Sequence, residues 1–230
     1  MKKKKRKIKI KLKSVIIFLV LIILVALIVC WYLNLKVSNI YVIGNSILKE
    51  NDILNSTNLL NYPKLKDVNE EKIKKDLLNN PLINKVIVKK TINGKVTIEI
   101  EENTPLLKMS DNLFILSNGE MEEIDYIGQI PYLKGEVDSA IFDNFVKKML
   151  LIDKDILIKI SEVMYAKTDL DNERFLMYMN DGNEVYITLS KIELINSYND
   201  IYPTLDKKKG ILYLDSGNHF EIKTKDTKVE

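Results

Sequence analysis

The chain has 230 residues, and its 35 Lys and Arg against 32 Asp and Glu give a formal net charge of +3. Nine of the basic residues lie in the first 13 positions, so subtracting them from +3 leaves −6 for residues 14–230. This composition argues against a nucleic-acid-binding protein, because phosphate recognition needs clustered Lys and Arg.

The first predicted element is a membrane-spanning helix at residues 15–33, which follows a basic head at residues 1–14. At about 1.5 Å of rise per residue this apolar stretch reaches roughly 28 Å, close to the hydrocarbon thickness of a bilayer. Positive charge stays inside, so we expect a cytoplasmic N-terminus that can contact membrane lipids, and residues 34–230 outside. Trp31 and Tyr32 lie at the exit of the span, where aromatic rings anchor a helix among headgroups.

Two other interpretations of the apolar stretch are weaker. A cleaved signal peptide has a shorter apolar region and small residues before the cut, whereas residues 29–32 read Val-Cys-Trp-Tyr. A lipoprotein signal would use Cys30, but Val29 stands at the position that needs a small residue. We therefore expect the segment to be retained as a single-pass anchor.

The residues after the span predict a first unit with the order strand, helix, helix, strand, strand. In the second helix Asn69 can cap the N-terminus, and Ile73 and Leu77 lie one turn apart on a buried stripe. Asn93-Gly94 is the commonest signal for a two-residue hairpin turn. A strict two-residue turn would mix polar and apolar residues on both faces, so we expect a bulge or a longer loop. The predicted elements are residues 37–43, 49–60, 69–78, 82–92 and 95–102.

A second unit, residues 105–216, is richer in strands. Asn118-Gly119 and Asp181-Gly182 each lie between two alternating segments and predict antiparallel hairpins. Two helices should cover the sheet: one carries the apolar stripe of residues 141–150, and the other opens with a capping box at Ser190 and Glu193. The remaining expectations are a final strand at residues 211–214 and a charged tail at residues 217–230.

Catalytic motifs are nearly absent. Cys30 is the single cysteine and His219 the single histidine, so neither a disulfide, a thiolate metal site nor a histidine-based triad can be assembled. Ser46 and Lys49 match S-x-x-K, but neither S-D-N nor K-T-G follows, and we interpret the match as a turn before the first helix. Three carboxylates, Glu99, Glu101 and Glu102, are better explained by a solvated strand face than by acid-base chemistry. We expect no catalytic residue, cofactor, metal or small-molecule substrate.

Several segments carry a resemblance in a consistent order after one membrane span. They are residues 40–45 (IYVIGN), 78–86 (LNNPLINKV), 96–105 (VTIEIEENTP) and 210–215 (GILYLD). Together they resemble the bacterial cell-division family FtsQ, called DivIB in Gram-positive bacteria. That family commonly has an acidic-basic-x-proline sequence where this chain has Glu102-Asn103-Thr104-Pro105, so the basic residue is missing.

The resemblance implies an α+β fold: a single N-terminal transmembrane helix, a POTRA domain (β-α-α-β-β) at residues 35–104, and a β-rich domain of antiparallel strands with two covering helices. It also implies a non-enzymatic protein of the cell membrane and division septum. Such a protein would bind the small bitopic proteins FtsL and FtsB (DivIC in Gram-positives) and help regulate septal peptidoglycan synthesis.

Partner binding by strand addition needs a sheet edge with unpaired backbone groups. We predict that edge at Ile211, Leu212, Tyr213 and Leu214, with Tyr198 and Tyr202 nearby; an equally open interpretation is that this strand is structural. Two other functions remain open: a POTRA-type module that handles polypeptides during export, and a membrane-tethered cell-wall enzyme.

Overall fold

The computed structural model describes residues 12–206 and 208–223. The predicted basic head falls mostly on residues 1–11, and the end of the predicted charged tail falls on residues 224–230; both stretches lie outside the described residues. The described chain divides into two compact units. The first holds the residues up to Asn80 together with Lys85–Glu101, and the second holds Pro81–Asn84 together with the residues from Glu102 on.

Helix α1, Leu12–Asn34, contains the predicted span. Among the described residues it is the one helix long and apolar enough to cross a membrane. Trp31 and Tyr32 are exposed near its end, and the Asn34 side chain donates a hydrogen bond to the Cys30 carbonyl at 2.9 Å. The helix is consistent with a single-pass membrane anchor.

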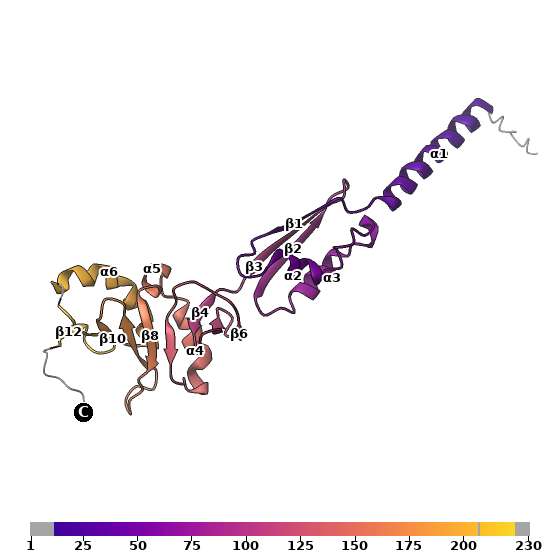
Figure 1. The fold of residues 1–230 in the computed structure, drawn as a ribbon. Helices are drawn as coiled ribbons and strands as arrows, with labels where there is room; N and C mark the ends of the chain where they lie inside the picture. The colour runs from indigo at the N-terminus through magenta and orange to yellow at the C-terminus, as the bar shows by residue number, and fades with distance from the viewer. Residues whose placement is uncertain (1–11, 207, 224–230) are drawn as a thin grey trace, which may run out of the picture. The chain divides into compact units, whose positions relative to one another are not determined.

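The first unit has the predicted element order and forms a three-stranded sheet in the order β1-β3-β2, with β1 parallel to β3. Figure 1 shows α2 and α3 together with this sheet. Apolar side chains of the helices, Ile53, Ile73 and Leu77, are buried with Val96 and Ile98 of β3. The elements are β1 Asn39–Ile43, α2 Glu50–Asn55, the 3-10 turn η1 Leu65–Asp67, α3 Glu70–Leu77, β2 Ile83–Lys90 and β3 Lys95–Glu102.

Two local predictions for this unit are confirmed. The Asn69 side chain caps α3 by accepting a hydrogen bond from the Lys72 amide at 3.1 Å. The β2–β3 turn is one residue longer than a two-residue hairpin: the Thr91 amide donates to the Lys95 carbonyl at 2.9 Å, and Gly94 adopts a φ of 87° inside the loop. The predicted helix at residues 49–60 is too long, because α2 ends at Asn55.

The second unit contains, in the described residues, a nine-stranded sheet in the order β12-β11-β10-β9-β8-β7-β4-β5-β6. Antiparallel pairs predominate, but the pairs β10–β11, β4–β7 and β7–β8 are parallel. The strands are β4 Pro105–Lys108, β5 Leu113–Leu116, β6 Met121–Glu123, β7 Tyr132–Lys134, β8 Ile160–Tyr165, β9 Arg174–Met179, β10 Glu184–Thr188, β11 Gly210–Tyr213 and β12 His219–Ile222.

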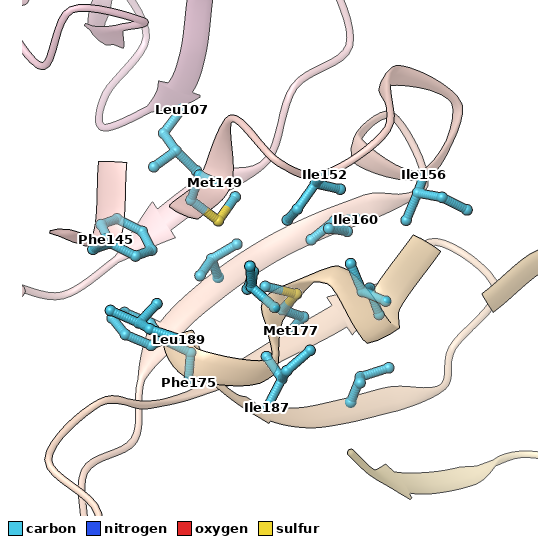
Figure 2. Close-up of a cluster of buried hydrophobic side chains, with 14 of the residues drawn as sticks. Leu107, Phe145, Met149, Ile152, Ile156, Ile160, Phe175, Met177, Ile187 and Leu189 are labelled. Atoms are coloured by element: carbon cyan, nitrogen blue, oxygen red, sulfur yellow. The ribbon is translucent and has the colours of Figure 1, made fainter. Parts of the chain in front are cut away.

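Helical segments supply the other half of this core. Figure 2 shows Phe145 and Met149 of α4 near Leu189 and the sheet residues Met177 and Ile187. All five are fully buried. The segments are α4 Ser139–Met149, α5 Lys154–Leu157, η2 Leu189–Ser197, α6 Tyr198–Ile201 and η3 Tyr202–Leu205.

The predicted capping box at Ser190 and Glu193 is wrong. The segment η2 already begins at Leu189, and its N-cap residue, Thr188, makes no side-chain cap bond. Lys191 is non-helical, with φ −117° and ψ 15°, so a kink lies between Ser190 and Glu193. The buried residues of η2 are Leu189, Ile192 and Ile195, spaced by three. All three pack in the hydrophobic core of the second unit.

Candidate partner-binding site

Strand β11 is not the edge of the sheet, so that part of the sequence prediction is wrong. Ile211, Leu212 and Tyr213 pair in parallel with β10, and β11 also pairs in antiparallel fashion with β12. Strand β12 lies within the segment predicted to be a charged tail, residues 217–230. The chain reverses after β11 through two residues with positive φ, Gly217 at 78° and Asn218 at 49°, and the sequence analysis did not predict this turn.

In the described residues, β12 is the strand at this end of the sheet. The Lys223 amide donates to the carbonyl of Lys209, the residue opposite it, at 3.0 Å. Alternate residues of an antiparallel strand turn their backbone groups toward opposite sides. His219 and Glu221 therefore face β11, whereas the N–H and C=O groups of Phe220 and Ile222 point away from the sheet, toward an incoming strand.

One face of this edge carries a row of stacked groups drawn from four strands. The Arg174 guanidinium lies 3.7 Å from the centroid of the Tyr186 ring. The Tyr186 and Tyr213 centroids are 5.4 Å apart, and the row ends at His219, 4.7 Å beyond Tyr213. Each step crosses to the neighbouring strand, so the row reaches the open edge at the exposed His219 ring.

Burial and a hydrogen bond hold Tyr213 in its neutral form. Burial raises the pKa of the Tyr213 hydroxyl, and so does the hydrogen bond it donates to the Glu221 carboxylate. The bond is 3.1 Å long and joins β11 to β12. It therefore supports the position of the edge strand.

The opposite face of the edge holds an apolar groove of about 300 Å³. Leu212 and Phe220 stand opposite each other in the β11–β12 register and form its floor. The segment from η2 to η3 supplies its other wall. The lining residues are Leu194, Ser197, Ile201, Thr204, Leu205, Leu212, Leu214, Asn218 and Phe220.

Tyr198, a predicted site residue, is 2% exposed and belongs to a buried polar network. Its hydroxyl donates to Asp181 Oδ2 at 2.7 Å and accepts from Asn183 Nδ2 at 3.0 Å. Asn183 Oδ1 in turn accepts from the Gly210 amide at 3.0 Å. Burial and the bond to Asp181 raise the pKa of the Tyr198 hydroxyl. The network ties α6, the β9–β10 turn and the start of β11 together, which positions the edge.

Tyr202 lies beside Tyr198, with 6.1 Å between ring centroids. Both rings line a second cavity, of about 350 Å³, together with Lys159, Asn180, Asp181 and Asn199. Of the other predicted site residues, Leu212 and Leu214 are buried, and Ile211 and Tyr213 are partly exposed. That any of these residues binds a partner stays a prediction.

The sequence analysis did not predict the ion pair between Arg174 and Asp215, which lies just after the end of β11. Arg174 Nε donates to Asp215 Oδ2 at 2.6 Å, and both side chains are largely buried. Burial acts to raise the pKa of the Asp215 carboxyl, but the hydrogen bonds from Arg174 and Ser216 outweigh it and lower that pKa. The pair links β9 to the turn before β12.

The residues with possible catalytic chemistry lie elsewhere. Ser46 sits in the bend before α2, and Lys49 is the residue that precedes that helix. Glu99 forms an ion pair with Lys89 at 2.8 Å on the solvated face of the first sheet. Within residues 12–206 and 208–223, no group of three His, Cys, Asp or Glu side chains could hold a metal ion.

The apolar helix, the β-α-α-β-β unit and the nine-stranded sheet of the described residues define a class: a POTRA protein with an N-terminal helix that can span a membrane and a β-rich second domain. The sequence model of the POTRA domain, FtsQ-type, matches residues 35–103. The chain belongs to the DivIB family of cell division proteins.

Two similar cell division proteins align along most of the chain, and one similar solved structure covers less than half of it. The cell division protein DivIB of Listeria monocytogenes is 30% identical over 200 residues, covering 81% of this chain and 72% of the relative. DivIB of Bacillus subtilis is 25% identical over 197 residues, covering 81% and 74%. The solved major extracytoplasmic domain of DivIB from Geobacillus stearothermophilus is 25% identical and covers 46% of this chain and 97% of that domain, with a TM-score of 0.38.

Proposed function

We propose that this chain is a non-enzymatic, membrane-anchored cell-division protein that binds the small bitopic proteins FtsL and FtsB (DivIC in Gram-positives). It acts at the division septum and helps regulate septal peptidoglycan synthesis. Membership of the DivIB family supports the division role. The apolar helix α1, which follows a basic head in the sequence, supports a cytoplasmic N-terminus with the two units outside.

The observation that carries the binding proposal is the open edge of β12. A partner segment that adds as a further strand would pair with the outward N–H and C=O groups of Phe220 and Ile222. Main-chain hydrogen bonds of this kind supply affinity for any extended segment. Specificity has to come from the side chains of that segment.

Two features beside the edge can bind those side chains selectively. A strand sends alternate side chains to opposite faces of the sheet. On one face an apolar side chain would meet the groove floored by Leu212 and Phe220. On the other face an aromatic or cationic side chain would extend the row that ends at His219. The edge therefore favours an extended segment that alternates apolar with aromatic or basic residues.

The test is affinity capture of the full-length chain from membranes, with the tag at the cytoplasmic end and bound proteins identified by mass spectrometry. Recovery of the two single-span division proteins would support the proposal. Recovery of translocation components or of wall substrates in their place would overturn it and favour an export module or a cell-wall enzyme.

A further inference from the structure

Three apolar side chains at one end of the first unit are exposed on loops. Leu60 is 46% exposed and Tyr62 is 49% exposed in the turn before η1, and Ile92 is 77% exposed in the β2–β3 turn. Leu59 of the first loop is buried in the core of the unit, whereas these three side chains stay exposed. Exposed apolar side chains that gather at one end of a domain indicate an interaction surface.

Hydrogen bonds tie both loops to the few residues that follow α1. The Leu65 amide donates to the Leu35 carbonyl at 2.8 Å, and the Val37 amide donates to the Pro63 carbonyl at 2.9 Å. On the other side of this segment the Ser38 amide donates to the Gly94 carbonyl at 2.8 Å. The two loops therefore flank the chain where it leaves α1.

A further bond reaches the helix itself. The Lys64 ammonium donates to the Asn34 side-chain oxygen at 3.1 Å, and Asn34 is the last residue of α1. This contact and the backbone bonds to residues 35–38 lie within the same compact unit. The loop of Tyr62 is thus attached at the end of the apolar span.

Chain reach keeps these loops close to the headgroup layer. One residue advances the chain by at most about 3.6 Å, and hydrogen-bonded neighbouring segments lie about 4.8 Å apart. The headgroup layer on each side of a bilayer is roughly 5 to 8 Å thick. Leu35, Val37 and Ser38 are one, three and four residues beyond α1, so they lie at most about 4, 11 and 14 Å past its last residue. This range begins inside the headgroup layer and ends just outside it, so the loops bonded to these residues lie beside the membrane surface.

The charge of this end suits an anionic lipid surface. Residues 35–38, 59–67 and 91–95 carry four lysines and one acidic residue, Asp67. The lysines are Lys36, Lys64, Lys66 and Lys95. Basic residues beside a membrane attract anionic headgroups, and a tyrosine places its ring at the boundary between tails and water.

We propose that Leu60, Tyr62 and Ile92, with the four lysines around them, form a lipid-binding footing that rests in the headgroup layer next to α1. The inference extends the proposed membrane anchoring and depends on it. The footing gives the POTRA domain a second attachment to the bilayer beside α1. The chemistry recognised is a phospholipid surface with anionic headgroups.

The test uses the fluorescence of the full-length chain in vesicles of phosphatidylcholine and phosphatidylglycerol that contain brominated lipid, which quenches indole at short range. The chain has a single tryptophan, Trp31, so the wild-type protein reports on the anchor alone. For the footing, Ile92→Trp is combined with Trp31→Phe. The matched control is Leu170→Trp with Trp31→Phe, since Leu170 is 99% exposed on a loop of the second unit.

We expect brominated lipid to cause a loss of fluorescence for wild type and for the Ile92→Trp variant, and none for the Leu170→Trp variant. Loss for wild type without loss for Ile92→Trp would overturn the footing and leave the anchor intact. No loss for wild type would overturn the anchoring itself. Equal loss for Leu170→Trp would show that contact is not confined to this end, which also contradicts the proposal.

Replacing phosphatidylglycerol by phosphatidylcholine separates an anionic surface from an apolar one. We expect the quenching of the Ile92→Trp variant to weaken while that of Trp31 stays the same, because a transmembrane helix does not depend on headgroup charge. Unchanged quenching of the Ile92→Trp variant would contradict the role given to the four lysines. The thermal unfolding curve of each variant, measured by circular dichroism, should match that of wild type and so establish that the loop substitution leaves the fold intact.

Discussion

The Tyr213 and His219 rings stack with 4.7 Å between their centroids and 9° between their planes. This contact joins β11 to β12, so the strand that the sequence placed at the sheet edge lies one position inside it. The edge residues that can meet a partner are then Phe220 and Ile222.

Ile222→Pro should block strand addition while leaving the protein folded. The Ile222 amide points away from β11, and proline is tolerated in an edge strand where its missing N–H faces solvent. We expect partner capture to fall about tenfold, or about 1.4 kcal/mol, with a change in unfolding free energy below about 1 kcal/mol. Quantitative capture and chemical denaturation measure the two effects.

The matched control for that variant is Ile222→Val, which keeps the amide and most of the side chain. It should capture the division partners as well as wild type does. Equal loss in both variants would mean that the side chain matters and the backbone does not. Full capture by the proline variant would exclude strand addition at β12.

Gly210→Ala should detach β12 from the sheet. A Cβ on Gly210 would lie 2.0 Å from the Glu221 carbonyl oxygen, a backbone atom of β12 that cannot move without breaking the pairing. We expect hydrogen exchange to show lost protection in β11 and β12 with β8 and β9 still protected. Partner capture should fall together with the protection of β12.

Gly135→Ala provides the comparison for that loss. Gly135 has a positive φ of 79°, but an added Cβ would meet nothing within 4 Å. The variant should lose about 1 to 2 kcal/mol from backbone strain alone and keep the protection of β12. If Gly210→Ala also kept that protection, the close approach of β11 to β12 would not be a real constraint.

Tyr198→Phe should destabilise the second unit by about 1 to 3 kcal/mol, because Asp181 and Asn183 each lose a buried hydrogen-bond partner. Tyr202→Phe is the control, because the Tyr202 ring stacks beside Tyr198 but is partly exposed. We expect this variant to change the free energy of unfolding by no more than about 0.5 kcal/mol. Urea denaturation of the two variants measures the difference. Similar losses would indicate that the network contributes nothing beyond ring packing.

Local patterns predicted much of this fold because their causes are local. Asn69 needs only an amide three residues away to cap α3, and Ile73 and Leu77 need only helical periodicity to share a face. The misfit of a two-residue turn at Asn93-Gly94 was also visible in the alternation of the two strands. The longer loop restores that alternation.

The edge strand and its supports depend on contacts between distant residues. Residues 219–222 alternate weakly and are too short to predict a strand without the partner that β11 supplies. The Arg174–Asp215 pair joins residues 41 positions apart, so spacing gives no signal for it. The alternation of Phe220 and Ile222 after Gly217-Asn218, a turn sequence, was the one available indication of β12.

The Arg174–Asp215 pair should make the second unit sensitive to acid. The pKa of Asp215 is lower in the folded chain than its ordinary value of 3.8, so the folded state favours the ionised carboxylate. The contribution of the ionised carboxylate to the free energy of unfolding is fully present above that ordinary value, and it is lost as the pH falls through the lowered folded value.

We expect Asp215→Asn to lower the free energy of unfolding by about 1.5 to 3 kcal/mol at neutral pH, because the substitution weakens a hydrogen bond to a charged group. Denaturation at a series of pH values should show the gap between wild type and variant closing below about pH 4. Glu99→Gln is the control, since the Lys89–Glu99 pair is well exposed and should contribute less than about 1 kcal/mol at any pH. A gap for Asp215→Asn that stayed constant into acid would mean that the cost of the substitution comes from packing and that the charge on Asp215 does not stabilise the edge.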